Sequence, residues 1–452
     1  MMSKYRDSMI KNAVKYLIIG NSAGGIGAAE GIRAIDHQGS MDIVADEPYL
    51  TYSRPLISHY LAAPGPREKL LYRPVDFYEK NGISTLLGKK VQKIDAVRHT
   101  VALTDGAEID YEKLLLATGG LPIVPRIMGV PGPRVFTFTT LSDAIAIDQF
   151  LCTLPQGPIS AVVVGGGLIG ISVTEALVKR GVKVTIVEMR ERVLNTILDE
   201  DTSVSAAQAL QTAGVNVITG GTVTEVKDSG GDNTITAVLG DGRQIPCHLM
   251  IIAIGVVPRV ELAVSAGIVV NRGIIVDRHM ATSVPDIYAC GDAAEAYDFI
   301  YDVCRVTPIL PNAYLGGKIA GFNMAGAVKE YAGGTTMNSV QYFGLDIVSA
   351  GNISPGKDGY EIITNRANGI YRKVILKDKL IVGMIFSGNT ERSGITYSLM
   401  KDRINVESFK KELVRADFGL SSLPEEIWRT KLQQTPKPVE DKAVVAVGEK
   451  ER

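Results

Sequence analysis

Residues 161–188 decide the fold of the central part of this chain. They read Ala161-Val-Val-Val-Gly165-Gly-Gly167-Leu168-Ile169-Gly170, continue through Thr174-Glu-Ala-Leu-Val-Lys-Arg180, and end in Val182-Lys-Val-Thr-Ile-Val-Glu188. An apolar strand therefore leads into G-x-G-x-x-G, a helical pattern follows, and a second strand ends on a carboxylate. This order predicts a complete βαβ unit that binds a dinucleotide.

Each residue of this fingerprint has a distinct physical role. Gly165 permits the tight turn, Gly167 lets a pyrophosphate approach the backbone, and Gly170 lets the helix pack against the strand. The first helical N–H groups, around Leu168 and Ile169, have no partner within the helix and can receive the phosphates. Glu188 is the expected ligand of the adenosine ribose, and Arg190 lies close to it.

A second copy of this pattern begins near the N-terminus. The predicted strand from Lys15 to Gly20 opens Gly20-Asn-Ser22-Ala23-Gly-Gly25-Ile-Gly, in which Ser22 replaces the middle glycine. Serine is small enough to let a phosphate approach. The next strand runs Met41-Asp-Ile-Val-Ala-Asp46-Glu47, so Asp46 is the expected ribose ligand, with Glu47 the alternative if the strand ends one residue later.

The two copies continue in parallel. An apolar strand leads into Ala117-Thr118-Gly119-Gly-Leu-Pro122, and another leads into Ala253-Ile-Gly255-Val-Val-Pro258. A strand that leaves a sheet at a glycine and is turned by a proline is suited to a crossing between domains. We therefore predict two nucleotide-binding halves, with the second inserted into the first.

Downstream, a predicted strand ends in Gly291-Asp292, and a helix is expected from about Asn312 to Ala325. The sequence changes to an alternating β pattern from about Gly333. The predicted fold is α/β, with two Rossmann-like dinucleotide-binding domains and a C-terminal α+β interface domain. The expected boundaries are residues 1–122 and 250–328 for the first domain, 123–249 for the second, 329–432 for the third, and 433–452 for a flexible tail.

Composition limits the partners and the location. The formal net charge is −1 over 452 residues, which gives no indication of nucleic acid or of an anionic membrane surface. The longest apolar runs are too short to span a bilayer. The four cysteines have no C-x-x-C spacing, so neither a disulfide framework nor a metal site is expected, and a reducing cytoplasm is the simplest setting.

These motifs together resemble the pyridine-nucleotide–disulfide oxidoreductase flavoproteins over roughly residues 14–425. The resemblance implies that Gly20, Ser22, Gly25 and Asp46 hold FAD and that Asp292 holds its ribityl chain. It implies that Gly165, Gly167, Gly170 and Glu188 hold NADH, and that the third domain lies at the interface of a homodimer. Further cofactor contacts are expected at Ala23, Glu47, Arg54, Ala117, Thr118, Gly119, Gly291, Asn312, Leu168, Ile169, Arg190 and Gly255.

The branch of the family depends on Thr51-Tyr52-Ser53-Arg54-Pro55-Leu-Ile-Ser58, where many relatives have a redox cysteine and this chain has none. Without a thiolate beside the flavin, a thiol–disulfide relay has no chemical basis. The run is similar to rubredoxin reductases, to ferredoxin reductases and to the flavin part of NADH-dependent nitrite reductases. The resemblance implies electron transfer from NADH, with NADPH use left open by Arg190 and Arg192, through FAD to an iron–sulfur protein such as rubredoxin or ferredoxin. An NADH oxidase and a flavin electron-transfer subunit of a larger complex are the alternatives.

Arg54 and Pro55 are the candidate catalytic residues of this loop. Many relatives follow the second fingerprint with a glutamate that pairs with a lysine beside the flavin. Here Ser172 stands in the place of the glutamate, and Arg54 is taken as the counterpart of the lysine. Glu175 is expected to be a solvated or interdomain residue. The candidates for a basic surface that docks an acidic partner are Lys373, Lys377, Lys379, Arg392, Lys401 and Arg403.

Overall fold

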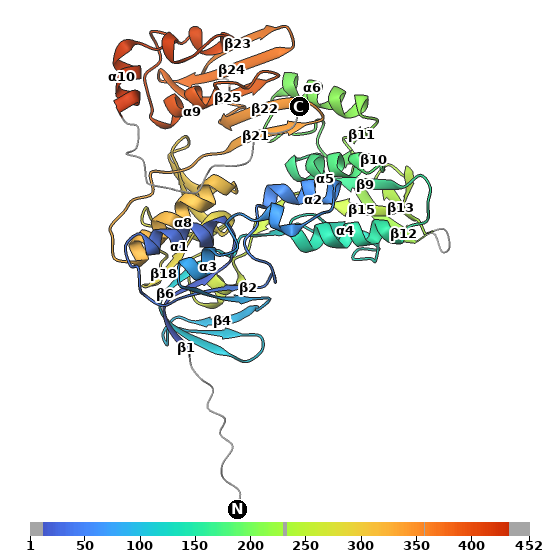
Figure 1. Ribbon diagram of the computed structural model, residues 1–452. Coiled ribbons are helices and arrows are strands. Elements are labelled where there is room, and N and C mark those ends of the chain that lie inside the picture. Colours follow the sequence, from blue (N-terminus) through green and yellow to red (C-terminus); the bar gives the residue numbers. More distant parts are fainter. Residues whose placement is uncertain (1–11, 229–232, 357, 434–452) are drawn as a thin grey trace, which may run out of the picture.

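Two parallel sheets, built to the same plan, make up the lower and right-hand parts of the molecule in Figure 1. The computed structural model describes residues 12–228, 233–356 and 358–433. In the parallel part of the first sheet the order is β3-β2-β1-β6, and β18 pairs in parallel with the last part of β6. These strands are β1 (Asn12–Ile19), β2 (Met41–Ala45), β3 (Ile83–Leu87), β6 (Glu108–Leu116) and β18 (Ile287–Ala289).

The second sheet repeats the plan in the order β11-β10-β9-β15-β8, again all parallel. Each central strand is apolar because helices cover the sheet, as parallel sheets require. Its strands are β8 (Val135–Thr137), β9 (Ser160–Val164), β10 (Lys183–Glu188), β11 (Asn216–Thr219) and β15 (Leu249–Ile252). Helix α1 (Ala23–Arg33) follows β1, and α5 (Leu168–Lys179) follows the corresponding strand β9. Helices α4 (Leu141–Thr153) and α6 (Glu200–Thr212) complete the second unit.

In each unit an antiparallel three-stranded meander leads into the fourth parallel strand, and in the first unit that strand, β6, is also the last strand of the meander. In the first unit it comprises β4 (Val91–Asp95), β5 (Thr100–Leu103) and the start of β6; in the second it comprises β12 (Val223–Asp228), β13 (Ile235–Leu239) and β14 (Gln244–Cys247). The predicted internal repeat is therefore a repeat of complete folding units. We call them the first module and the second module.

The chain crosses between the modules on a two-stranded antiparallel ribbon. It consists of β7 (Gly120–Pro122) and β16 (Val256–Pro258), so the two predicted crossing motifs pair with each other. Strand β15 lies wholly in the second sheet. The return to the first module therefore comes after residue 252, and the boundary placed at 249/250 from the sequence is a few residues too early.

Two helices of the first module pack with their backbones in contact. Helix α1 and helix α8 (Leu310–Met324) meet through glycines, and α8 corresponds to the helix predicted from about Asn312. A Cβ atom at Gly317 would lie 2.0 Å from the carbonyl oxygen of Gly24, and one at Gly27 would lie 2.2 Å from that of Tyr314. The first turns of α1 are therefore held against the middle of α8.

The segment after β2 leaves the first module and packs on the second. It contains η1 (Arg54–Leu56), α2 (Ile57–Ala62) and η2 (Arg67–Leu70). Tyr52, Ile57 and Leu61 share a buried apolar cluster with residues of α4 and α5, and α2 lies beside α5 in Figure 1. The loop that was expected to flank the flavin is therefore held by both modules.

The third domain is an antiparallel sheet with helices on one side, at the top of Figure 1. Its strand order is β21-β22-β25-β24-β23, and one face shares the apolar cluster of the second module through Ile347, Ile385 and Tyr371. The strands are β21 (Met337–Tyr342), β22 (Leu345–Gly351), β23 (Glu361–Ala367), β24 (Ile370–Lys377) and β25 (Leu380–Ser387). Helices α9 (Ser393–Lys401) and α10 (Glu425–Gln433) follow, with turns η4 (Glu412–Val414) and η5 (Leu420–Ser422) between them.

The remaining elements are α3 (Phe77–Lys80), α7 (Glu261–Ser265), β17 (Ile274–Ile275), η3 (Gly291–Ala293), β19 (Ala294–Asp298) and β20 (Val303–Val306). The predicted tail lies outside the described residues from 434 onward. Within the described part of the chain, no helix is both long and apolar enough to cross a membrane.

Candidate functional site

The second fingerprint has the geometry of a phosphate cradle. Gly165 has a φ of +110°, and a Cβ there would lie 2.4 Å from the carbonyl oxygen of Ala253. At Gly170 a Cβ would lie 1.9 Å from the carbonyl oxygen of Gly165, so the helix can approach the strand only without a side chain. Gly167, by contrast, has no heavy atom within 4 Å of a Cβ position. The open space beside Gly167 and the N-terminus of α5 that follows it fit a pyrophosphate.

The first fingerprint has the same geometry. A Cβ at Gly20 would lie 2.1 Å from the carbonyl oxygen of Ala117, and one at Gly25 would lie 2.0 Å from that of Gly20. Ser22 is the N-cap residue of α1, as Gly167 is of α5, and its side chain makes no capping hydrogen bond. Ala23 is the first helical residue. The serine therefore stands where the phosphates would approach, with its hydroxyl not engaged by the helix.

Glu188 is held in place by the backbone of its own module. It is the last residue of β10 and is buried. Its Oε2 accepts a hydrogen bond from the N–H of Gly166 at 2.6 Å, and its Oε1 accepts one from the N–H of Arg190 at 2.8 Å. The carboxylate is thus fixed beside the fingerprint, and the Arg190 side chain is exposed next to it.

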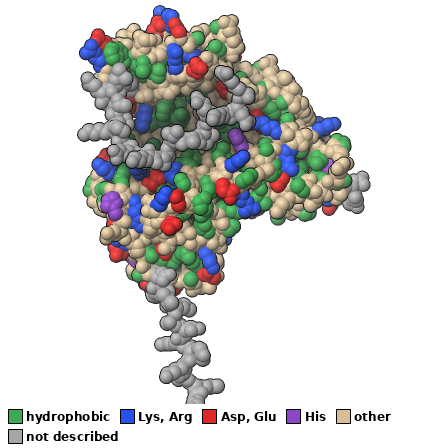
Figure 2. All heavy atoms as spheres, in the orientation of Figure 1, with side chains coloured by type: hydrophobic (Ala, Val, Ile, Leu, Met, Phe, Trp, Pro, Cys, Tyr) green, Lys and Arg blue, Asp and Glu red, His purple; other side chains and the backbone are tan. Residues whose placement is uncertain are grey.

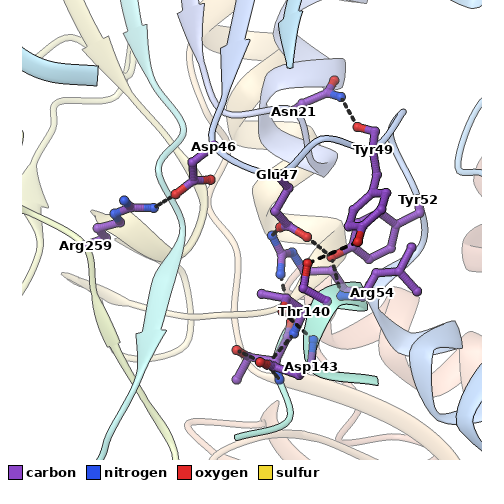
Figure 3. Close-up of polar contacts among 12 residues, drawn as sticks. Asn21, Asp46, Glu47, Tyr49, Tyr52, Arg54, Thr140, Asp143 and Arg259 are labelled. Carbon is purple, nitrogen blue, oxygen red and sulfur yellow. Dashed lines mark hydrogen bonds and ion pairs between the residues drawn. The ribbon is translucent and has the colours of Figure 1, made fainter. Parts of the chain in front are cut away.

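The two acids after β2 have separate partners, as Figure 3 shows. Strand β2 ends at Ala45, so Asp46 follows it directly. Asp46 Oδ2 accepts a hydrogen bond from Arg259 Nη1 at 2.6 Å. Glu47 instead accepts from the Tyr52 hydroxyl at 2.6 Å and from Arg54 Nη2 at 2.6 Å. The condition for choosing Glu47 as the ribose ligand, a longer strand, is not met.

Arg54 joins the two modules. Its Nη1 donates to the carbonyl oxygen of Thr139 at 2.8 Å, just before α4, while its Nη2 binds Glu47. Tyr52, on the same loop, accepts a hydrogen bond from the N–H of Leu141 at 3.0 Å. The Arg54 side chain remains 42% exposed, and Pro55 after it is exposed. The loop is therefore anchored to both modules, while part of Arg54 and Pro55 remains accessible.

Asp292 follows β18, and Asn312 lies at the start of α8, both in the first module. Asp292 is in η3, directly after β18 and Cys290. Burial raises the pKa of Asp292, and the nearby Arg54 guanidinium opposes this by lowering it. Asn312 is in the first turn of α8, where its side-chain amide donates to the carbonyl oxygen of Thr335 at 3.2 Å. Gly291 has a φ of +71°, which favours glycine at this turn.

The two crossing motifs are joined to each other by hydrogen bonds. Thr118 donates through its hydroxyl to the carbonyl oxygen of Arg259 at 2.8 Å, and the N–H of Arg259 donates to Gly119 at 2.9 Å. Gly119 and Gly255 both have positive φ, and no heavy atom lies within 4 Å of a Cβ at Gly119. Arg259 was not recognised from the sequence, although it follows the second crossing motif directly.

None of the four cysteines belongs to the loop at residues 51–58. Cys247 and Cys290 are buried, and burial raises the pKa of each thiol to about 12. Cys152 and Cys304 are exposed. All four are free thiols, and in the described residues no group of three or more His, Cys, Asp or Glu side chains could hold a metal ion.

The basic residues expected to form a docking surface on the third domain are only partly free of partners within the protein. Lys373 is paired with Asp199 at 3.0 Å, and both side chains are only 12% exposed, so Lys373 is not available to a partner. Arg392 donates to the carbonyl oxygen of Asp417, and Arg403 donates to that of Phe299. On the face shown in Figure 2, lysines and arginines are interspersed with acidic side chains. Lys377, Lys379 and Lys401 remain exposed.

Glu175 is an interdomain residue. Its Oε1 accepts a hydrogen bond from the N–H of Phe343 in the third domain at 3.0 Å, and Lys179 lies 3.4 Å away on the same helix. Of the two roles expected for Glu175, the contact between domains is the one confirmed.

Comparisons with known proteins agree with this architecture. The family described as pyridine nucleotide-disulphide oxidoreductase matches residues 14–313, and the rubredoxin NAD+ reductase C-terminal domain matches residues 337–404. The NADH-dependent phenylglyoxylate dehydrogenase subunit epsilon of Aromatoleum evansii is 30% identical, over 92% of this chain and 98% of that protein. Putidaredoxin reductase CamA of Pseudomonas putida is 35% identical, over 66% of this chain and 71% of its own. Other curated relatives are about twice as long, and the chain covers 51% and 48% of two of them.

Among solved structures, the covalent putidaredoxin reductase–putidaredoxin complex superimposes with a TM-score of 0.80 at 26% identity. The similarity covers 93% of this chain and 99% of that one. These matches confirm the resemblance and the fold class that were inferred from the sequence. The chain belongs to the pyridine nucleotide-disulphide oxidoreductase family and is an oxidoreductase that uses FAD and NADH.

Proposed function

We propose that this protein takes electrons from NADH and delivers them one at a time to an iron–sulfur protein, either a rubredoxin or a ferredoxin. The observation that carries the proposal is the loop at residues 51–58. It joins two complete dinucleotide modules through Arg54, and it contains no cysteine.

The residues of the first module fit FAD. We infer that Gly20, Ser22, Ala23 and Gly25 receive its pyrophosphate and that Asp46 receives the adenosine ribose. Asp292 would accept hydrogen bonds from the ribityl hydroxyls, and the N-terminus of α8 would face the pyrimidine edge of the flavin. When bound, FAD supplies a group that accepts a hydride and can release the two electrons singly.

The residues of the second module fit NADH. We infer that the N–H groups of Leu168 and Ile169 receive its pyrophosphate beside Gly167 and that Glu188 accepts the ribose hydroxyls. The carboxylate of Glu188 disfavours a 2′-phosphate by charge repulsion. The exposed Arg190 lies next to it, so NADPH is proposed as a secondary substrate.

Arg54, Tyr52 and Glu47 would fix the geometry between the two cofactors. Their hydrogen bonds to Thr139 and Leu141 tie the loop of the first module to the start of α4 in the second. A fixed distance between modules is what direct hydride transfer requires, because the reacting atoms must be held in near contact. We propose that Arg54 and Pro55 border the flavin and that no thiol takes part.

A second candidate function is that of an electron-transfer subunit. It is favoured by the subunit from Aromatoleum evansii, of which the chain covers 98%. We further propose a cytoplasmic location, consistent with four free cysteines, and a homodimer.

The test is anaerobic reduction of the FAD-loaded protein by NADH, followed by stopped-flow reoxidation with rubredoxin, ferredoxin or oxygen. Ferricyanide serves as an acceptor that needs no docking site. We expect an iron–sulfur protein to reoxidise the protein faster than oxygen at equal concentration. Faster reoxidation by oxygen would instead indicate an oxidase, and slow reoxidation by all three, with fast ferricyanide turnover, would favour the subunit.

A further inference from the structure

The turn between β21 and β22 reaches from the third domain onto the nucleotide-binding helix of the second module. The Tyr342 hydroxyl donates to the carbonyl oxygen of Leu168, the first residue of α5, at 3.3 Å. The N–H of the next residue, Phe343, donates to Glu175 Oε1 at 3.0 Å, two turns along the same helix. Strand β21 and α5 are in contact, and the two pairs of residues are 174 and 168 positions apart in sequence.

Ser172 completes this contact. Its hydroxyl lies beside the Tyr342 oxygen and acts to lower the pKa of the phenol, so Tyr342 contacts both the first and the second turn of α5. Burial, supported by the charge of Glu175, raises the pKa of Tyr342 to about 12, and the phenol therefore remains a donor at neutral pH. In this chain the position at which many relatives are expected to have a glutamate therefore contacts the third domain.

A second, independent anchor lies on α6. Asp199 caps this helix by accepting from the N–H of Thr202 at 3.1 Å. Its other oxygen accepts from the Tyr371 hydroxyl at 2.8 Å and from Lys373 Nζ at 3.0 Å, both on β24. The third domain therefore holds the N-terminal ends of both α5 and α6, each of which follows a strand of the second sheet (Figure 1).

The position of the α5 N-terminus matters because its free N–H groups are the phosphate donors of the second fingerprint. Gly170 sets the distance of α5 from the sheet, because a Cβ at this residue would lie 1.9 Å from the carbonyl oxygen of Gly165. That contact does not fix the position of the first turn along the helix axis or its rotation about that axis. The hydrogen bond of Tyr342 to Leu168 acts at this turn, and Ser172 in the next turn lies beside the same phenol.

We propose that Tyr342 is a positioning residue for the nicotinamide nucleotide: through Leu168 and Ser172, the third domain sets the N-terminal turn of α5 to receive the pyrophosphate. The inference rests on nucleotide binding at the second fingerprint and is independent of the electron acceptor. Removing the Tyr342 hydroxyl would let this turn relax. The affinity for the dinucleotide would then fall, although no group that touches the dinucleotide has been removed.

The experiment uses the FAD-loaded full chain and the variants Tyr342→Phe and Ser172→Ala. The affinity for NAD⁺ is measured by isothermal titration calorimetry, and that for NADH from the saturation of the flavin-bleaching rate. We expect Tyr342→Phe to raise both dissociation constants about three- to tenfold, the effect of losing one net hydrogen bond. The limiting bleaching rate and the FAD content should stay close to wild type.

The matched control is Tyr360→Phe, the same substitution in the same domain. Tyr360 precedes β23, which is at the opposite edge of the sheet from β21. A Tyr342→Phe protein that melts earlier but binds NAD⁺ with wild-type affinity would overturn the proposal, because only a structural role would remain. If that variant retains no FAD, Ser172→Ala decides, with weaker NAD⁺ binding supporting the proposal and unchanged binding overturning it. None of these readouts involves rubredoxin, ferredoxin or oxygen, so failure of the proposed acceptor is detected separately.

Discussion

Arg259 Nη1 lies 2.6 Å from Asp46 Oδ2, although the two residues are 213 positions apart in sequence. Arg259 follows the crossing ribbon at the point where the chain re-enters the first module, and Asp46 follows β2. The pair therefore connects the return crossing to the acid that we propose as the adenosine ribose ligand. Because the side chain of Asp46 is 43% exposed, the strength of this ion pair depends on ionic strength.

Arg259→Gln is expected to weaken FAD retention several-fold. The substitution removes the guanidinium that orients Asp46 and leaves the backbone contacts of Arg259 with Thr118 and Gly119 in place. The FAD dissociation constant can be measured from the flavin fluorescence that appears on dilution. Arg243→Gln, which breaks an exposed pair with Asp241 in the second module, is the control and should leave FAD retention unchanged. Tighter FAD binding in Arg259→Gln would show that the ion pair competes with the ribose.

Glu188 should determine the choice between NADH and NADPH. Its carboxylate is fixed by the N–H groups of Gly166 and Arg190, so it cannot turn away from a 2′-phosphate. We expect Glu188→Ala to lower kcat/KM for NADH by about tenfold and to raise it for NADPH. Steady-state kinetics with both nucleotides is the measurement, and Glu191→Ala, an exposed acid in the same loop, is the control. An unchanged ratio in Glu188→Ala, or a wild-type preference for NADPH, would contradict the role assigned to Glu188.

The sequence was sufficient for features whose signal is local. Glycines at fixed spacing predicted both fingerprints, and the paired Ala-x-Gly-x-x-Pro runs predicted the crossing, because only certain backbone conformations and approaches require glycine there. Side-chain partners from distant segments were not predictable. The sequence around Lys373 does not indicate that this residue pairs with Asp199 at the start of α6. The sequence around Arg259 likewise does not indicate its ion pair with Asp46. Strand β15 was split between domains because a fully buried apolar strand carries no indication of which sheet contains it.

The reactivity of the cysteines should follow burial. Cys152 and Cys304 are exposed, whereas burial raises the pKa of Cys247 and of Cys290 to about 12. Between pH 7 and pH 9 the buried pair should therefore remain protonated and unreactive, since a raised pKa keeps a thiol neutral at every pH below it. Native protein should react rapidly with a thiol reagent at two positions and, once unfolded, at all four.

NADH reduction should leave that thiol count unchanged and should consume two electrons per FAD. An anaerobic titration with NADH, followed by thiol counting, measures both quantities. A requirement for four electrons, or the appearance of two additional thiols, would reveal a hidden disulfide and contradict the absence of a thiol relay.

Gly317 should be among the least tolerant positions in the chain. A Cβ at this residue would lie 2.0 Å from the carbonyl oxygen of Gly24, and the obstacle is backbone on both sides, so no side chain can move aside. Alanine would separate α8 from α1 and displace the helix ends that flank the proposed FAD site. Overpacking of this kind costs about 1–3 kcal/mol, or more where the backbone is rigid. Gly317→Ala is therefore expected to lower the melting temperature by several degrees and to lose FAD.

Gly394→Ala is the matched control, because Gly394 is an exposed residue of α9 with no heavy atom within 4 Å of a Cβ position. Alanine at position 394 should be neutral or stabilising by about 0.5–1 kcal/mol, the difference in helix propensity. Thermal denaturation with and without added FAD measures both variants, and a Gly317→Ala protein that melts with the control and keeps its flavin would show that the two helices can separate without disturbing the site.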